Sequence, residues 1–323
     1  MPIHWQAQIS QSLNDPNQLL TYLDLDPKDF NLAKSPFPFR VTHAFASRME
    51  KGNPHDPLLL QVIPLQEECL ELEQFVQDPV MDLASALSPG VIQKYAGRIL
   101  LITTGACAIH CRYCFRREYP YISQKLTRSS LLQNIALFRE NPEIHEVILS
   151  GGDPLTLSNE RIQEIIDLVS DVSHIRTIRF HTRLPIVLPD RIDRELVAIL
   201  SAARTKIVIV IHSNHPRELD ESVLEALRTL QMAGVVLLNQ TVLLRRINDD
   251  PSILIALSRR LFEMGVLPYY LHELDKARGT SHFEVKKLDS KDIIEAMRNA
   301  LPGYLVPRLV REIPGEPSKT LLG

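Results

Sequence analysis

The chain has 323 residues, of which 45% are hydrophobic, and a formal net charge of −3 at pH 7. This length suits one α/β barrel or two ordinary domains. The slight negative charge argues against nucleic acid as the main partner. No apolar run approaches the roughly 20 residues needed to cross a bilayer, and the N-terminal stretch MPIHWQAQISQSLND lacks the features of a secretory signal. We therefore expect a cytoplasmic protein that does not associate with membranes.

Residues 1–95 carry helical patterns, as in PNQLLTYLDL, which are broken by proline-bearing stretches such as KSPFPFRV. The patterns predict an N-terminal helical extension over this range. Cys69, in LQEECLEL, is interpreted as an ordinary thiol.

From Arg98 onwards, short β-branched runs alternate with amphipathic segments, a pattern typical of parallel βα units. Strands are predicted at 98–104, 146–151, 177–182, 206–212, 234–243 and 266–272. Helices are predicted at 129–141, 159–172, 190–203, 221–234 and 251–265. Six strands with helical crossovers suit a doubly wound sheet or an incomplete (β/α) barrel. Since no Gly-x-Gly-x-x-Gly follows the first strand, a dinucleotide-binding fold is disfavoured.

Polar stretches follow five of the predicted strands. They are TTGACAIHCRYC, SGGDP, HTRLP, HSNHP and HELDK. In parallel α/β folds the loops that leave the strand ends carry the functional groups, so these stretches should line one rim. His212, His215 and Gln240 also lie at such positions, where each suits a structural hydrogen bond equally well.

Three of the four cysteines, Cys107, Cys111 and Cys114, form a C-x3-C-x2-C pattern. Three thiolates can hold three corners of a four-iron cube and leave the fourth iron open. The alternative is a structural zinc with His110 or another histidine as the fourth ligand, but zinc sites usually contain paired C-x2-C motifs and no second pair exists here. In SGGDP, Gly151 and Gly152 allow the backbone to approach a ligand closely, although the motif alone also suits a simple turn.

This cysteine spacing, with an aromatic residue before the last cysteine, resembles the radical S-adenosylmethionine (SAM) superfamily. The resemblance implies an incomplete (β/α)6 barrel and a [4Fe–4S] cluster on the three cysteines, whose open iron binds SAM. An external electron donor would reduce the cluster. The resemblance also implies SAM contacts from Gly151, Gly152, Asp153 and Gln240.

A closer resemblance, to the lysine 2,3-aminomutase family, covers nearly the whole chain. It is carried by CRYCFRR, SGGDPL, RLPIVLPDRI, LLNQTVLLRRIND, LPYYLHELDK and GYLVPRLVREIPGEPSKT. Members of this family combine the cluster with pyridoxal 5′-phosphate (PLP). The resemblance implies that Lys319 forms a Schiff base with PLP and that Arg98 lies near its phosphate. A primary amine suits this role because it can exchange its imine for that of a substrate amine.

The resemblance further implies an L-lysine substrate. Arg116 matches the arginine that binds the substrate carboxylate, for which a guanidinium fork is the best partner. Asp275 and Glu312 match the two positions that receive the ε-ammonium group, and acidic residues at both favour lysine. Clostridial-type members have aspartate where Glu312 stands, so this contact departs from the family pattern.

The segments RMEKGNPHDPLLLQV and REIPGEPSKT resemble the bacterial branch that makes (R)-β-lysine for elongation factor P. In that branch a lysyl-tRNA-synthetase-like ligase attaches the β-lysine. The expected organisation is the extension at 1–95, the barrel at 96–305 and a PLP-binding segment at 306–323. A radical SAM enzyme of another reaction type and a zinc-stabilised binding module are the alternative interpretations.

Overall fold

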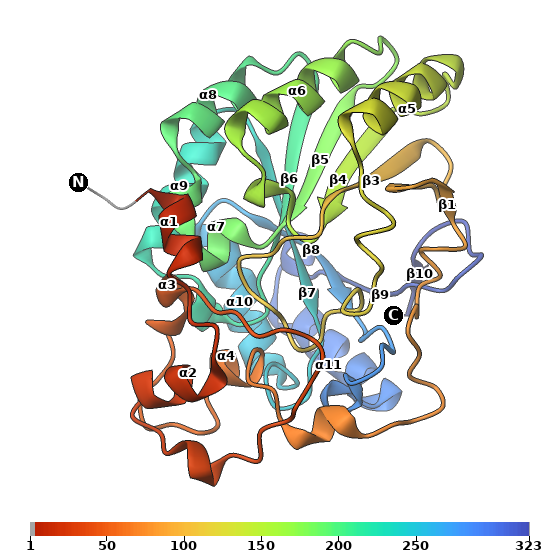
Figure 1. Cartoon of the computed structure of the whole chain (residues 1–323). Helices are drawn as coiled ribbons and strands as arrows, with labels where there is room; N and C mark the ends of the chain where they lie inside the picture. Colours follow the sequence, from red (N-terminus) through yellow and green to blue (C-terminus); the bar gives the residue numbers. More distant parts are fainter. Residues whose placement is uncertain (1–3, 323) are drawn as a thin grey trace.

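The computed structural model describes residues 4–322, apart from the side chains of residues 287 and 288. A ten-stranded sheet forms its centre, and the strands lie side by side in chain order (Figure 1). Strands β3 to β9 are parallel to one another, whereas β1, β2 and β10 are antiparallel to their neighbours. The strands are β1 Ala86–Ser88, β2 Val91–Ile92, β3 Arg98–Thr104, β4 Glu146–Gly151, β5 Thr177–Thr182, β6 Lys206–His212, β7 Val236–Val242, β8 Leu267–His272, β9 Arg308–Arg311 and β10 Thr320–Leu321.

The incomplete (β/α)6 barrel expected from the sequence is confirmed. Strands β3 to β6 match the predicted ranges residue for residue, and β7 and β8 are slightly shorter than predicted. The sheet contains a further parallel strand, β9, which pairs with β8 after the helix α11 (Lys287–Ala300). Sequence patterns missed β9 because its four residues, RLVR, are too few to show a period and have arginine at both ends.

The long helices between strands β3 and β8 pack on the outer face of the sheet (Figure 1). They are α5 Arg128–Glu140, α6 Asn159–Ser170, α8 Arg194–Ala202, α9 Glu221–Met232 and α10 Pro251–Glu263. The side chains of Thr127, Ser158, Asp193, Asp220 and Asp250 cap their first turns by accepting a backbone N–H. The helix predicted at 190–203 therefore begins later, at Arg194, after the short 3₁₀ turn Pro189–Arg191.

The N-terminal segment contains four short helices, α1 Trp5–Ser10, α2 Pro16–Tyr22, α3 His43–Ala46 and α4 Pro57–Leu60, on the left of Figure 1. Its last residues form β1 and β2, which extend the sheet from β3. Phe45, Leu58 and Leu59 are fully buried and belong to the same hydrophobic cluster as Ile99 of β3. The segment and the barrel thus share one core, while the boundary at residue 95 stays a prediction.

Within residues 4–322, none of the helices combines the length and the apolar character that a bilayer span requires.

Candidate functional site

A cavity of about 450 Å³ lies on the inner face of the sheet. Alternate residues of several strands point into it, among them Arg98 and Leu100 of β3 and Arg179 and His181 of β5. Loops from the strand ends complete its wall. The lining includes every site residue predicted from the sequence: Arg98, Cys107, Cys111, Cys114, Arg116, Gly151, Gly152, Asp153, Gln240, Asp275, Glu312 and Lys319.

The cysteine loop follows β3 and is held against the end of β4. The backbone N–H groups of Gly152 and Asp153 donate to the carbonyls of Thr104 and Ala106, at 2.7 and 2.8 Å. A Cβ on Gly152 would lie 2.3 Å from the Ala106 carbonyl oxygen, and Gly151 has φ +127°. Both positions therefore require glycine. The close backbone approach predicted for this glycine pair is made here to the chain's own cysteine loop.

The Asp153 carboxylate also supports this region. It accepts hydrogen bonds from the hydroxyl of Thr182 and from the backbone N–H groups of Leu155, Arg183 and Leu184. Burial raises its pKa. With four donors inside the protein, the side chain fixes the loops after β4 and β5. Its contact with SAM stays a prediction.

All three clustered cysteines face the cavity. Burial raises the pKa of Cys107 well above its usual value and that of Cys114 to about 11, and neighbouring thiols add to both shifts. A bound cationic centre reverses this effect, because metal-bound thiols lose their protons. Among the described residues, no three His, Cys, Asp or Glu side chains converge on one metal position. A cubane cluster needs no such convergence, since each thiolate binds a different iron. The donor set fits the cluster.

Lys319 reaches the cavity because β10 pairs with β9 as a hairpin. This pairing sets Thr320 opposite Arg311 and brings Lys319 close to Glu312. The Lys319 Nζ lies 2.5 Å from Glu312 Oε2, and the hydroxyl of Tyr95 donates to Oε1 at 2.6 Å. Burial opposes ionisation of Glu312, but Lys319 and Tyr95 outweigh it and lower the pKa of the carboxyl. An ionised carboxylate therefore holds the lysine amine.

Asp82 is a site residue that the sequence analysis missed. Its buried carboxylate contacts Arg116 Nε at 2.6 Å and Lys94 Nζ at 2.7 Å. Lys94 in turn lies 3.6 Å from Glu312. Although burial opposes its ionisation, the two cations lower the pKa of Asp82. Charges thus alternate along the cavity wall from Arg116 through Asp82, Lys94 and Glu312 to Lys319, and fix the predicted site residues relative to one another.

Another part of the wall holds buried side-chain nitrogen atoms without hydrogen-bond partners. Within the described residues, the Nε atoms of Arg98 and Arg179 and the Nε2 atom of His181 have no hydrogen-bond partner. Burial keeps the pKa of His181 well below its usual value. A guanidinium N–H without a partner suits an anion such as a phosphate, although Arg179 also pairs with Glu146 through Nη2 at 2.8 Å. The side of the cavity at Arg98 therefore fits the phosphate of PLP. Arg179 and His181 carried a signal in the sequence, since polar residues at alternate positions are unusual in a buried parallel strand.

Asp275 follows β8 and lies in the same cavity. In the described part of the chain, no group hydrogen-bonds to its carboxylate. Burial raises its pKa to about 6, although the nearby charge of Lys319 opposes the shift. Such a carboxylate is suited to receive a cation. Gln240, on β7, also lines the cavity. His215 caps a short turn with its ring and lies outside the cavity lining, so its role is structural.

The raised pKa of Asp275 predicts a pH-dependent effect on stability. Below about pH 3 the carboxyl is protonated in both the folded and the unfolded chain, so Asp275→Asn should leave the free energy of unfolding nearly unchanged. Between about pH 4 and pH 6 the unfolded chain releases the proton while the folded chain keeps it, so the wild type loses stability relative to the variant over this range. At pH 7.5 the ligand-free variant should be more stable by at most about 3 kcal/mol. Denaturant unfolding at several pH values measures the difference.

The exposed Glu71 offers a control, and Glu71→Gln should show no comparable trend. A stability difference for Asp275→Asn that does not grow between pH 4 and pH 7.5 would contradict the assignment.

Comparisons with known proteins give consistent results. Residues 101–255 match the Radical SAM superfamily. The chain is 43% identical to an L-lysine 2,3-aminomutase of Buchnera aphidicola and 42% identical to one of Escherichia coli, with 98% of this chain and 94% of each relative covered. It is 32% identical to the L-lysine 2,3-aminomutase of Clostridium subterminale, of which it covers 77%.

Proposed function

This chain belongs to the L-lysine 2,3-aminomutase family of radical SAM enzymes, and from this premise we propose that its cavity binds L-lysine between the cysteine loop and Lys319. It is an isomerase that moves the amino group of L-lysine from C2 to C3. The observation that carries the site proposal is that Lys319 and the three cysteines, far apart in the sequence, line one cavity. The alternative interpretations require no such lysine.

The cofactors of this family are a [4Fe–4S] cluster, SAM and PLP. The donor set of Cys107, Cys111 and Cys114 fits the cluster, and Lys319 together with the unpartnered donor of Arg98 fits PLP. When bound, the cluster and SAM supply radical chemistry and PLP supplies a carrier for the migrating amine. The protein contributes positioning and exclusion of water.

The charges in the cavity support a specific lysine orientation. Arg116 is held by Asp82 and by the Ser150 hydroxyl at 3.0 Å, so its guanidinium is preset for the substrate carboxylate. Asp275 and Glu312 receive the ε-ammonium at the other end. Glu312 already holds a chemically equivalent group, the Nζ of Lys319. Its longer side chain, compared with aspartate, therefore reaches an alkylammonium without difficulty.

Two segments that resemble the elongation factor P branch support the cellular role that we propose. The product, (R)-β-lysine, is the group that a lysyl-tRNA-synthetase-like ligase attaches to elongation factor P. The enzyme works in the cytoplasm with an external electron donor. The chain is 43% and 42% identical to the Buchnera and Escherichia relatives but 32% identical to the Clostridium relative, which supports a branch distinct from the clostridial one.

An anaerobic assay tests the proposed function. Purified protein is incubated with L-lysine, SAM, PLP and a reductant, and the amino acids are separated on a chiral phase. We expect β-lysine of R configuration, and none when SAM or PLP is omitted. Formation of 5′-deoxyadenosine without any β-lysine would instead indicate a radical SAM enzyme of another reaction type.

A further inference from the structure

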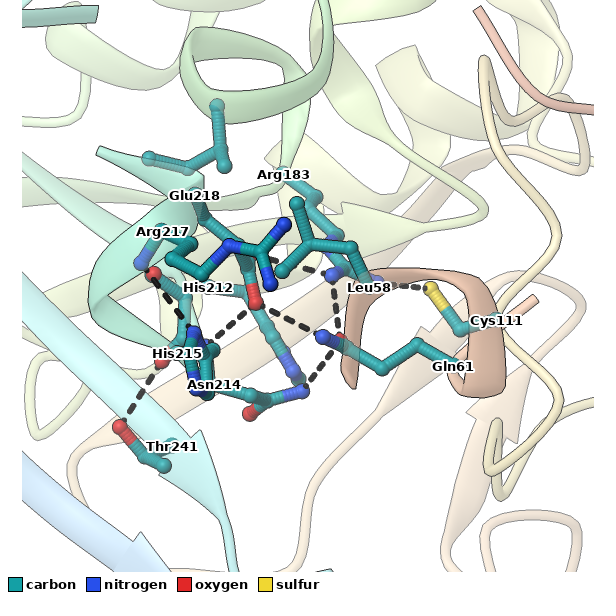
Figure 2. A network of polar contacts seen from close by, with 12 residues as sticks. Leu58, Gln61, Cys111, Arg183, His212, Asn214, His215, Arg217, Glu218 and Thr241 are labelled. Atoms are coloured by element: carbon teal, nitrogen blue, oxygen red, sulfur yellow. Dashed lines mark hydrogen bonds and ion pairs between the residues drawn. The ribbon is translucent and has the colours of Figure 1, made fainter. Parts of the chain in front are cut away.

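Arg183 lies directly after β5 and points toward the cysteine loop (Figure 2). Its Nη1 donates to Cys111 Sγ and to the Tyr113 hydroxyl, both at 2.7 Å. In the described part of the chain, no arginine or lysine side chain hydrogen-bonds to the sulfur of Cys107 or Cys114. Cys111 is therefore distinguished from the other two thiols by contact with a cationic donor.

The guanidinium of Arg183 is fixed from its other side. Nη2 donates to the side-chain oxygen of Gln61 at 2.7 Å and lies 3.2 Å from Glu218 Oε2. Gln61, from the N-terminal segment, also donates to Glu218 at 3.0 Å, and Glu218 is fully buried. Figure 2 shows these groups meeting around Arg183. Because both ends of the guanidinium are bound, its position beside Cys111 is set by the fold.

We propose that Arg183 is a positioning residue that raises the reduction potential of the iron–sulfur cluster through its N–H group on the Cys111 sulfur. This inference rests on the cluster of the proposed function. Reduction adds an electron to a centre that already carries thiolate charge. A fixed cation and an N–H···S hydrogen bond stabilise the reduced form more than the oxidised form, and hydrogen bonds to sulfur and net charge are known determinants of such potentials.

Glu218 acts on the same centre with the opposite sign. Its carboxylate partly neutralises Arg183, so it lowers the potential that Arg183 raises. Replacing the two residues in turn should therefore give a result that a simple loss of packing would not give. Removing the cation and removing the anion should shift the potential in opposite directions, although both changes disturb the same buried network.

The test is a redox titration of the cluster-loaded protein in the absence of SAM and lysine. Electron paramagnetic resonance measures the reduced cluster at each potential. Arg183→Met, which keeps the length but cannot donate, should lower the reduced-to-oxidised ratio at a fixed potential about tenfold. For one electron this corresponds to a fall of about 59 mV in midpoint potential. Glu218→Gln should raise the midpoint, and it remains decisive if the methionine variant does not fold.

Arg191→Met provides a matched control. Arg191 is also fully buried, but its guanidinium bonds to the carbonyls of Leu155 and Leu157 and stacks on Trp5. Its loss should leave the potential unchanged. Equal midpoints for the wild type and Arg183→Met, or shifts of the same sign for Arg183→Met and Glu218→Gln, would overturn the inference. A wild-type protein that takes up no cluster would overturn the proposed function as well.

Discussion

Replacing Lys319 with methionine should reduce the formation of β-lysine by at least about 10³-fold, the scale of loss expected when a covalent catalytic group is removed. Methionine has a similar length but no amine, so it cannot carry PLP. Borohydride reduction followed by peptide mapping should place a pyridoxyl group on Lys319 in the wild type and on no lysine in the variant. Chiral amino-acid analysis measures the activity.

The amount of iron–sulfur cluster in the variant distinguishes the loss of the catalytic amine from misfolding. Lys319 contacts Glu312 and no cysteine, so the iron content and the paramagnetic signal of Lys319→Met should equal those of the wild type. Lys276, which pairs with Glu284 outside the cavity lining, supplies the control variant Lys276→Met. A pyridoxyl label on a different lysine of the wild-type protein would show that the C-terminal hairpin has another role.

Replacing Cys114 with serine should remove the cluster and lower the activity more than about 100-fold. Loss of a cluster ligand should reduce activity by more than the 10- to 100-fold that is typical when a residue supporting a ligand is replaced. Iron and acid-labile sulfide, measured after anaerobic purification, should both fall sharply. Because the hairpin that carries Lys319 is untouched, PLP should still be trapped on it.

Cys69 provides the matched comparison, since it is an exposed free cysteine outside the cavity lining. Cys69→Ser should keep the iron, the sulfide and the activity. If the wild-type protein contained zinc without sulfide, the zinc-stabilised module would be the better interpretation. The Cys114 and Lys319 variants thus test the two cofactor positions independently, and each reports on the integrity of the other.

Local patterns in the sequence determined most of the barrel. The strands from Arg98 to His212 were predicted residue for residue, because buried parallel strands are continuous β-branched runs with clear turn signals at both ends. The cysteine spacing, the glycine pair and Lys319 were also visible, since each is a short motif or a match to family sequences. The presence of the cysteines and the glycine pair in one cavity follows from the rule that functional loops leave the same end of a parallel sheet, whereas the hairpin of β9 and β10 places Lys319 there.

Only the tertiary structure showed how these residues are held. Asp82 is bonded to Arg116 and Lys94, and the buried Glu68 binds Arg112 Nε at 2.6 Å beside the cysteines. In each case, residues of the N-terminal segment contact the site. An acidic residue in a loop has the same local pattern whether it faces solvent or pairs with a buried arginine.

The contact of Arg183 with Cys111 was hidden for the same reason. The motif HTRLP indicated the end of a strand, but it did not indicate which cysteine its arginine contacts. The sequence by itself therefore determined which chemical groups are present and at which end of the sheet they lie. Their pairing was decided by the packing of segments distant in the chain, because ion pairs and hydrogen bonds between such segments form only when the whole fold brings them together.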